Sequence, residues 1–206
     1  MSRGRLITIE GIDGAGKTTL ALGLQDELSR RGVGIQLRRE PGGVAAAERM
    51  RELVKDPELR IGARAEALLY AAARAQLVEE EIEPLLETGS WVLLDRFVDS
   101  SLAYQGAGRQ LGIDSVREIN QFATGGLRPD RTLLLVVEPA VGRSRSRSRT
   151  EPADRLERES DEFFARINDG YQELLRQDPQ RIRSIDAGQP ADLVLAQALE
   201  ELGDLI

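Results

Sequence analysis

The stretch Leu6-Ile7-Thr8-Ile9-Glu10-Gly11-Ile12-Asp13-Gly14-Ala15-Gly16-Lys17-Thr18-Thr19-Leu20 decides the fold. It begins with a short β-branched run. Four residues then separate Gly11 from Gly16-Lys17-Thr18, which matches G-x-x-x-x-G-K-[ST] at every fixed position. The leucines that follow have helical spacing: Leu20, Leu24 and Leu28. Strand, glycine-rich loop and helix in this order are typical of a phosphate-binding loop, because glycine lacks a Cβ and a helix N-terminus attracts anions.

The loop predicts a nucleotide site with a metal ion. Lys17 places a charge near the β and γ phosphates, and Thr18 offers a hydroxyl to Mg²⁺. The chain has two lysines, Lys17 and Lys55, against 28 lysines and arginines together, so a compact ammonium at this position stands out. The alternative is an ordinary glycine-rich turn. We expect nucleotide contacts from the whole loop: Gly11, Ile12, Asp13, Gly14, Ala15, Gly16, Lys17, Thr18 and Thr19.

Composition narrows the class of protein. The 206 residues are most simply one domain, and 41% hydrophobic with 31% charged residues is typical of a soluble globular chain. The chain lacks cysteine and histidine, which excludes disulfides, thiolate chemistry and histidine bases. A net charge of −7 argues against nucleic acid as a partner. We expect no membrane span and no signal peptide, and therefore a cytoplasmic location.

Strands and helices alternate along the chain. We expect strands over 5–10, 33–37, 91–95, 132–137 and 181–186. We expect helices over 16–31, 44–56, 63–88, 114–123, from Pro139 onward, 154–177 and 191–202. Such alternation implies crossover connections and an α/β fold with a parallel sheet.

Polar residues follow several of these strands, where open α/β sheets place ligands. One group is Arg39-Glu40-Pro41-Gly42-Gly43, although an ordinary turn would also explain it. Another is Asp95-Arg96, and an acid at a strand end suits Mg²⁺ or its waters. Ser100–Gly106 suits either base and sugar contacts or simple capping. Tyr70 and Arg74 share a helix face, and the residues alone are typical of a core tyrosine beside a surface arginine.

These motifs, in this order, resemble the bacterial thymidylate kinase family over nearly the whole chain. The resemblance rests on Glu10–Thr19, Arg39–Gly43, Tyr70 with Arg74-Ala75-Gln76, Asp95-Arg96-Phe97, Ser100–Gly106, Arg128-Pro129-Asp130 and Asp154-Arg155-Leu156-Glu157. It implies phosphorylation of dTMP to dTDP by ATP with Mg²⁺. It also implies a three-layer P-loop NTPase fold, with a five-stranded parallel sheet flanked by helices, and a homodimer.

Carried over position by position, the resemblance implies roles around the substrate dTMP. Tyr70 would stack on thymine, where the family often has Phe, and Arg74 would bond the base's carbonyl edge. Ser101 and Gln105 would lie near the base, and Tyr104 near the sugar, where a 2′-OH would sit.

The resemblance also implies how phosphates are held. Arg39 and Arg96 would clamp the acceptor phosphate, and Glu40 and Pro41 belong to the same substrate loop. The metal would be held by Thr18, Asp95 and Asp13. Catalysis would depend on Lys17, Asp13, Arg96, Arg147 and Arg149. Residues 186–189 would border adenine. Val44 departs from the family, which usually has Thr there, so a hydroxyl contact at that position is not expected.

The phosphate loop is also compatible with other classes of nucleotide-binding protein. A GTPase switch normally needs Asn-Lys-x-Asp, but neither Asn120 nor Asn168 precedes a lysine. An ATPase driving a partner protein would need no small acceptor. A nucleoside kinase has no acceptor phosphate to clamp, so Arg39 and Arg96 argue against it. A kinase for another nucleotide is the nearest alternative.

The segment Arg143-Ser144-Arg145-Ser146-Arg147-Ser148-Arg149 is the most biased in composition. One interpretation is a disordered Arg-Ser tract. The resemblance instead predicts a small mobile lid at about 143–154, because the phosphate loop contains no arginine and some family members carry the catalytic arginine in the lid. We favour Arg147 and Arg149, which lie nearest the break at Pro152.

Single alanine substitutions within 143–149 test this. Transition-state arginines contribute about 10³–10⁵ in kcat, whereas solvated ones contribute little. Arg143 and Arg147 share one helix face, and Arg145 and Arg149 another, so their effects should be unequal. We expect a large kcat loss at one or two positions with dTMP KM nearly unchanged. Four variants with wild-type kcat would return the segment to a solvated basic face.

Overall fold

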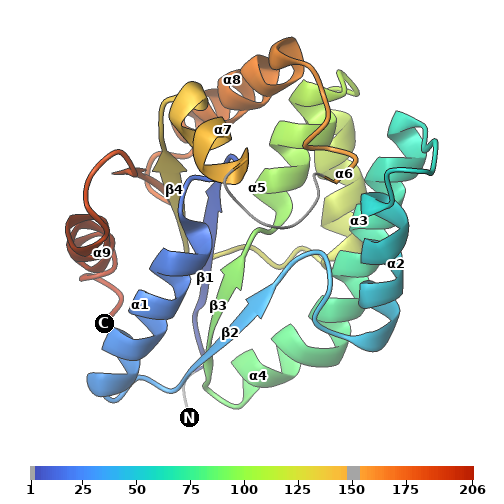
Figure 1. Cartoon of the computed structure of the whole chain (residues 1–206). Coiled ribbons are helices and arrows are strands. Elements are labelled where there is room, and N and C mark those ends of the chain that lie inside the picture. The colour runs from blue at the N-terminus through green and yellow to red at the C-terminus, as the bar shows by residue number, and fades with distance from the viewer. Residues whose placement is uncertain (1–2, 148–153) are drawn as a thin grey trace.

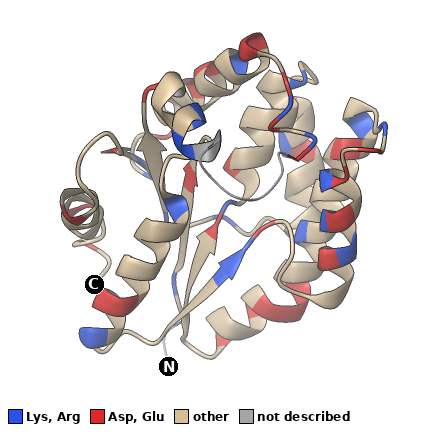
Figure 2. Cartoon of the chain, in the orientation of Figure 1, with Lys and Arg blue, Asp and Glu red and all other residues tan. Residues whose placement is uncertain are grey.

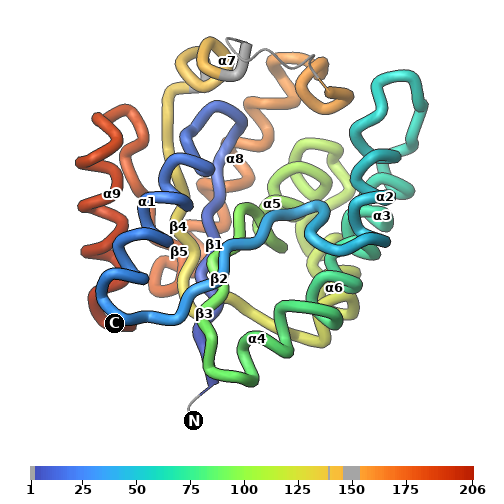
Figure 3. The backbone as a smooth tube through the Cα atoms, turned by 60° about the horizontal axis from the view of Figure 1, so that its bottom comes forward, coloured from blue at the N-terminus to red at the C-terminus, as the bar shows by residue number. Residues whose placement is uncertain are grey.

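The computed structural model describes residues 3–147 and 154–206. Five strands form one parallel sheet in the order β2-β3-β1-β4-β5, with helices on both faces (Figures 1 and 3). The strands are β1 (Leu6–Gly11), β2 (Ile35–Arg39), β3 (Trp91–Asp95), β4 (Arg131–Val136) and β5 (Ile182–Asp186). The α/β class and the five-stranded parallel sheet predicted from the sequence are confirmed.

The helices form the outer layers. They are α1 (Lys17–Arg30), α2 (Ala45–Lys55), α3 (Ala63–Leu77), α4 (Glu83–Glu87), α5 (Val98–Ser101), α6 (Ile113–Ala123), α7 (Pro139–Arg147), α8 (Asp161–Gln177) and α9 (Ala191–Glu200). Two π-helical segments, η1 (Val78–Ile82) and η2 (Leu102–Gly108), continue α3 and α5. In Figure 1, α1 and α9 lie on one side of the sheet, and α2, α3 and α6 lie on the other.

Alternating strand side chains supply two hydrophobic cores. On β3, Leu93 packs in the cluster that includes Leu24 and Leu28 of α1. Its neighbours Val92 and Leu94 pack instead with residues of α3, η1 and α4. Successive side chains of a strand point to opposite faces, so a continuous apolar run serves both layers.

Three of the expected elements differ most from the structure, whereas the ends of the others agree to within two residues. The second strand begins at Ile35 and ends at Arg39, two residues later than expected. It is an edge strand, and charged residues are tolerated there. The expected helix 63–88 is a continuous helical run, but η1 widens it between α3 and α4.

The third difference is the helix expected over 154–177, which begins only at Asp161. The Asp154 side chain accepts the backbone N–H groups of Leu156 and Glu157, both at 3.0 Å, and so makes a turn. Ser160 caps α8 through a hydrogen bond from the Phe163 N–H. The expected helix break at 150–153 lies outside the described residues.

The strand register collects the candidate motifs at one edge of the sheet. Asp95, the last residue of β3, lies opposite Ile9 of β1 and Arg39 of β2. The phosphate loop, the Arg39–Gly43 segment and Arg96 therefore leave the sheet side by side. Within the described ranges, no helix is both long and apolar enough to span a membrane.

Candidate active site

An open cavity of about 280 Å³ lies at this carboxyl edge. Figure 2 shows basic positions at the start of α1 and at the end of β2, and Lys17 and Arg39 of these elements line the cavity. The predicted residues that line it are Asp13, Gly16, Lys17, Thr18, Thr19, Arg39, Glu40, Pro41, Tyr70, Arg74, Asp95, Arg96, Ser101, Tyr104 and Gln105. Residues from five separate stretches of the chain thus face one space.

The phosphate loop has a backbone that requires glycine. Gly11 has φ 136°, and a Cβ there would lie 2.6 Å from the Leu135 carbonyl oxygen. Gly16, with φ 96°, precedes the first residue of α1. Lys17 is that first residue, and its Nζ donates to the carbonyl oxygens of Gly11 (3.1 Å) and Ile12 (3.0 Å). Burial, with the charge of Arg96, lowers the pKa of Lys17 to about 8.

Thr18 and Asp95 form a pair suited to Mg²⁺. The Thr18 hydroxyl donates to the Asp95 carboxylate at 3.4 Å. Mg²⁺ usually binds one or two protein oxygens together with substrate phosphates and waters. The Thr18 hydroxyl and the Asp95 carboxylate match this pattern. Within the described residues no cluster of three or more acidic ligands exists, so a dedicated protein cage for a metal is not present there.

Arg96 is the most constrained cation of the site. Its φ of 71° is unusual for a non-glycine residue. Its guanidinium donates to Asp13 (2.7 Å), to the Tyr104 hydroxyl (3.3 Å) and to the Gly11 carbonyl oxygen (3.0 Å). It also lies 5.1 Å from the centroid of the Tyr104 ring. These contacts hold one guanidinium between the phosphate loop and η2.

A buried acid, Glu10, organises the backbone around Arg96. Its carboxylate accepts the Phe97 N–H (2.8 Å), the Ser100 N–H (3.2 Å) and hydroxyl (2.5 Å), and the Tyr171 hydroxyl (3.0 Å). Burial raises the pKa of Glu10. Glu10 was not predicted to have a role, although a charged residue inside an apolar strand is a signal that could have identified it.

Arg74 and Tyr70 reverse the interpretation that the residues alone favour. Arg74 is only 2% exposed, whereas Tyr70 is partly exposed and lines the cavity. The Arg74 guanidinium donates to Glu40 (2.7 Å), Ser101 (2.9 Å), the Phe97 carbonyl oxygen (2.9 Å) and Asn120. The core-tyrosine, surface-arginine reading was wrong, because a buried carboxylate compensates the buried guanidinium.

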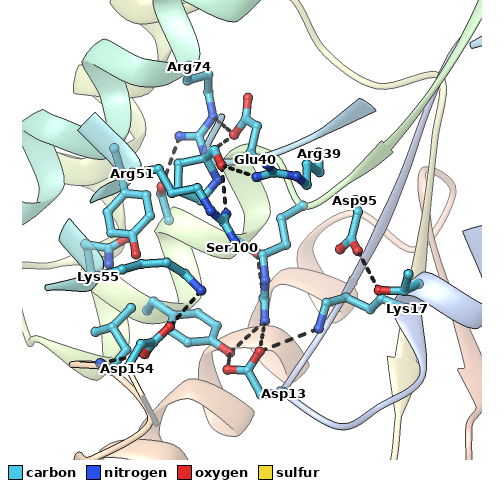
Figure 4. A pocket seen from close by; sticks show the side chains of 18 of the residues that line it. Asp13, Lys17, Arg39, Glu40, Arg51, Lys55, Arg74, Asp95, Ser100 and Asp154 are labelled. Carbon is cyan, nitrogen blue, oxygen red and sulfur yellow. Dashed lines mark hydrogen bonds and ion pairs between the residues drawn. The ribbon is translucent and has the colours of Figure 1, made fainter. Parts of the chain in front are cut away.

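The cavity also contains residues that were not predicted individually as site residues: Arg51 and Lys55, and Ser100, Asp154 and Leu156, which belong to motifs noted in the sequence. Arg51 donates to the Pro41 carbonyl oxygen at 2.8 Å, and Lys55 pairs with Asp154 at 2.9 Å (Figure 4). Arg51 and Lys55 lie four residues apart on α2, so their helical spacing was the available signal. Asp154 was noted as part of a motif without a role.

The arginine-rich segment lies over the phosphate loop. A Cβ at Gly142 of α7 would approach Ile12 Cδ1 to 2.8 Å and the Asp13 carbonyl oxygen to 3.0 Å. Arg143 pairs with Asp161 at 3.0 Å, and Arg145 donates to the Ala187 carbonyl oxygen at 3.0 Å. Residues 143–147 are helical, not a disordered tract. The Arg147 side chain and all of Arg149 lie outside what is described, so the choice between lid arginines stays a prediction.

The buried Glu40 should make the stability of the protein depend on pH. Its Oε2 accepts from Arg74, while Oε1 is buried without a partner among the described residues. Burial raises the pKa of Glu40 from 4.5 to about 7, against the opposing effect of Arg74. The folded protein therefore holds this proton more tightly than the unfolded chain. The resulting stabilisation is complete below about pH 4.5 and is lost as pH rises through about 7.

We expect Glu40→Gln, which cannot titrate, to lack this pH dependence. Between pH 5 and pH 8, the free energy of unfolding of this variant should rise by about 2–3 kcal/mol relative to that of the wild type, because only the wild type loses this stabilisation. Urea denaturation at several pH values measures this. The control Glu87→Gln, at an exposed glutamate of α4, should follow the wild type. Parallel curves for Glu40→Gln and the wild type would contradict the expectation.

Comparison with known proteins agrees with this geometry. The model of the thymidylate kinase family matches residues 9–198. A thymidylate kinase of Alkalilimnicola ehrlichii is 46% identical over 202 residues, covering 98% of this chain and 93% of that protein. One of Deinococcus radiodurans is 46% identical over 197 residues, covering 96% and 95%.

A solved structure supports the same conclusion. The crystal structure of thymidylate kinase from Ehrlichia chaffeensis superposes with a TM-score of 0.81 at 28% identity, covering 98% of this chain and 99% of that one. Family model, relatives and structure all span nearly the full length. The chain belongs to the thymidylate kinase family.

Proposed function

We propose that this chain transfers the γ-phosphoryl group of ATP to the phosphate of dTMP, with Mg²⁺, to give dTDP and ADP. One observation carries the proposal: the phosphate loop and the predicted base-binding residues line one cavity, with Arg96 held between them. A donor nucleotide on the loop and an acceptor beside Tyr70 would then meet at the cationic centre. Transfer of a phosphoryl group requires such positioning and charge neutralisation above all.

The phosphates would be bound by the fixed cations. Lys17 would leave its contacts with the loop carbonyl oxygens for the β and γ phosphates of ATP. Arg96 and Arg39 would bind the acceptor phosphate, and Arg51, which also faces the cavity, would add to that charge. A phosphate monoester with a second pKa of about 6 is mostly deprotonated at neutral pH, so no general base is required.

Mg²⁺ would be held by Thr18 and Asp95 together with the phosphates, and it would neutralise the charge that builds up on them. The carboxylate of Asp13 is turned toward Arg96 and Tyr104. We therefore assign Asp13 to orienting Arg96, and its contact with the metal stays a prediction.

The nucleobase would lie against Tyr70 and beside Ser101 and Gln105. Arg74 donates to protein groups through all three of its nitrogens, so we assign it to holding Glu40 and Ser101 in place. Its contact with a base carbonyl stays a prediction, as do the role of Tyr104 in sugar choice and a cytoplasmic location.

Measuring ADP formation from Mg·ATP with separate acceptors tests the proposal. We expect dTMP to be the best substrate among dTMP, dUMP, UMP, dCMP, AMP, GMP and thymidine, by a wide margin in kcat/KM. Thymidine lacks a phosphate for the arginines to bind, so it should give almost no turnover. Faster turnover of dCMP or AMP than of dTMP would refute the base assignment.

We further propose a homodimer through the face formed by α2, α3 and α6, which lie side by side in Figure 1. Large apolar side chains are exposed there, namely Leu53 (46%), Leu68 (56%) and Phe122 (92%). Exposed apolar side chains gathered on one face are typical of an interface.

Sedimentation equilibrium tests the dimer. The wild type should have twice the chain mass of 22.7 kDa. Phe122→Glu should shift it toward the monomer, because a charge would be buried at the contact. Leu193→Glu, at a residue of α9 that is 52% exposed on the other side of the sheet, should not. A monomeric wild type at micromolar concentration would exclude this interface.

A further inference from the structure

Glu66 is a buried acid that the proposed function does not use. It lies in the first turn of α3, is 0% exposed and does not line the substrate cavity. A buried carboxylate is costly unless it is fully paired. Glu66 is paired: it binds Arg109 at 3.0 Å and Arg155 at 2.7 Å. Its Oε1 also accepts a hydrogen bond from the side-chain amide of Gln105 at 2.9 Å.

This last bond determines how the Gln105 amide is turned. A carboxylate can only accept hydrogen bonds, so the amide nitrogen must face Glu66. Turning the amide over would bring two acceptor oxygens together. Gln105 Oε1 accepts no hydrogen bond from the described residues and is not among their enclosed, unpartnered atoms. Gln105 lines the cavity, and with its nitrogen turned to Glu66 we infer that its carbonyl oxygen is the amide atom left to accept a hydrogen bond from a ligand there.

The surrounding contacts keep Glu66 in place. Arg109 also pairs with Glu159 at 2.6 Å and lies 4.7 Å over the Phe163 ring. Arg155 donates to the Val54 carbonyl oxygen at 3.0 Å. Two arginines anchored from α8 and α2 therefore hold the carboxylate that orients Gln105. Arg155 belongs to the 154–157 motif, for which the sequence analysis offered no role.

We propose that Glu66 is the positioning residue for base selectivity: it fixes Gln105 as a hydrogen-bond acceptor, so the site takes a pyrimidine with an N–H at ring position 3 and rejects cytosine. Thymine and uracil carry that N–H. Cytosine has a lone pair there and an amino group in place of a carbonyl. An acceptor facing a lone pair is left unpaired, and sites built to bond a specific polar group discriminate strongly against analogues that lack it.

The test compares dTMP and dCMP as acceptors for Glu66→Gln. A glutamine at 66 can donate as well as accept, which lets the Gln105 amide turn over. We expect the dTMP-to-dCMP ratio of kcat/KM to fall at least about tenfold, the equivalent of one hydrogen bond. A purely structural role would lower both activities together, and an unchanged ratio would overturn the proposal.

Two further variants guard against loss of folding and supply the control. In Glu66→Gln, Arg109 keeps its ion pair with Glu159, but Arg155 loses its ion pair with Glu66. The double variant Glu66→Gln with Arg155→Met removes this unpaired cation. It should show the same fall in the dTMP-to-dCMP ratio. Arg155→Met alone leaves the carboxylate bound through both oxygens to Arg109 and still facing Gln105, so it should keep the wild-type ratio. An altered ratio in Arg155→Met alone would contradict the assignment to Glu66.

A double-mutant cycle localises the effect. In a Gln105→Leu background, which removes the amide, Glu66→Gln should leave the ratio unchanged. A further fall there would mean that Glu66 acts by another route. The inference rests on the proposed dTMP kinase activity, and the two can fail separately. A wild type that does not prefer dTMP refutes the activity, whereas a wild type that does, with an unchanged ratio in Glu66→Gln, refutes only the role of Glu66.

Discussion

The parallel pairing of β1 with β3, and of β3 with β2, brings the phosphate loop, Arg96 and the Arg39–Gly43 loop together at one edge of the sheet. Ile9, Asp95 and Arg39 lie at matching register positions. Because parallel strands end at the same edge, the phosphate loop, Arg96 and the Arg39–Gly43 loop must emerge together. A slip of one residue in this register would turn Asp95 to the other face and separate it from Thr18, its partner at 3.4 Å.

Buried carboxylates provide the next level of order. Glu10 accepts bonds from the segment that carries Arg96, Glu40 holds Arg74, and Glu66 holds the Gln105 amide. Each acid is buried and thus expensive to desolvate, and each has a compensating donor: Glu10 and Glu66 accept from several groups, and Glu40 accepts from Arg74. In return, the side chains that Glu40 and Glu66 contact, Arg74 and Gln105, are held in place before any ligand binds. Such preorganisation is what electrostatic stabilisation of a transferring phosphoryl group requires.

The two halves of the cavity differ in how they are built. The donor half uses backbone: glycines at positive φ and the N-terminus of α1. The acceptor half uses side chains that come from α2, α3 and η2, and the π-helical geometry of η2 places the consecutive residues Tyr104 and Gln105 on the cavity. π-helical turns are often found at functional sites. This division suits the proposed reaction. Nucleotide phosphates are bound by many kinds of enzyme, whereas recognition of the acceptor base is particular to one family.

The sequence by itself determined the phosphate loop, the five strands and the α/β class, because these depend on local patterns: glycine spacing, apolar runs and turn residues. The motifs and their order also identified most residues of the cavity. Only the tertiary structure decided that Arg74 is buried, that 154–160 forms turns, and that Glu10, Glu66, Arg51 and Lys55 matter to the site. From the local sequence alone, a charged residue is predicted to lie on the surface. Its burial becomes favourable only when a partner of opposite charge comes from a distant segment, as Glu40 does for Arg74 from 34 residues away.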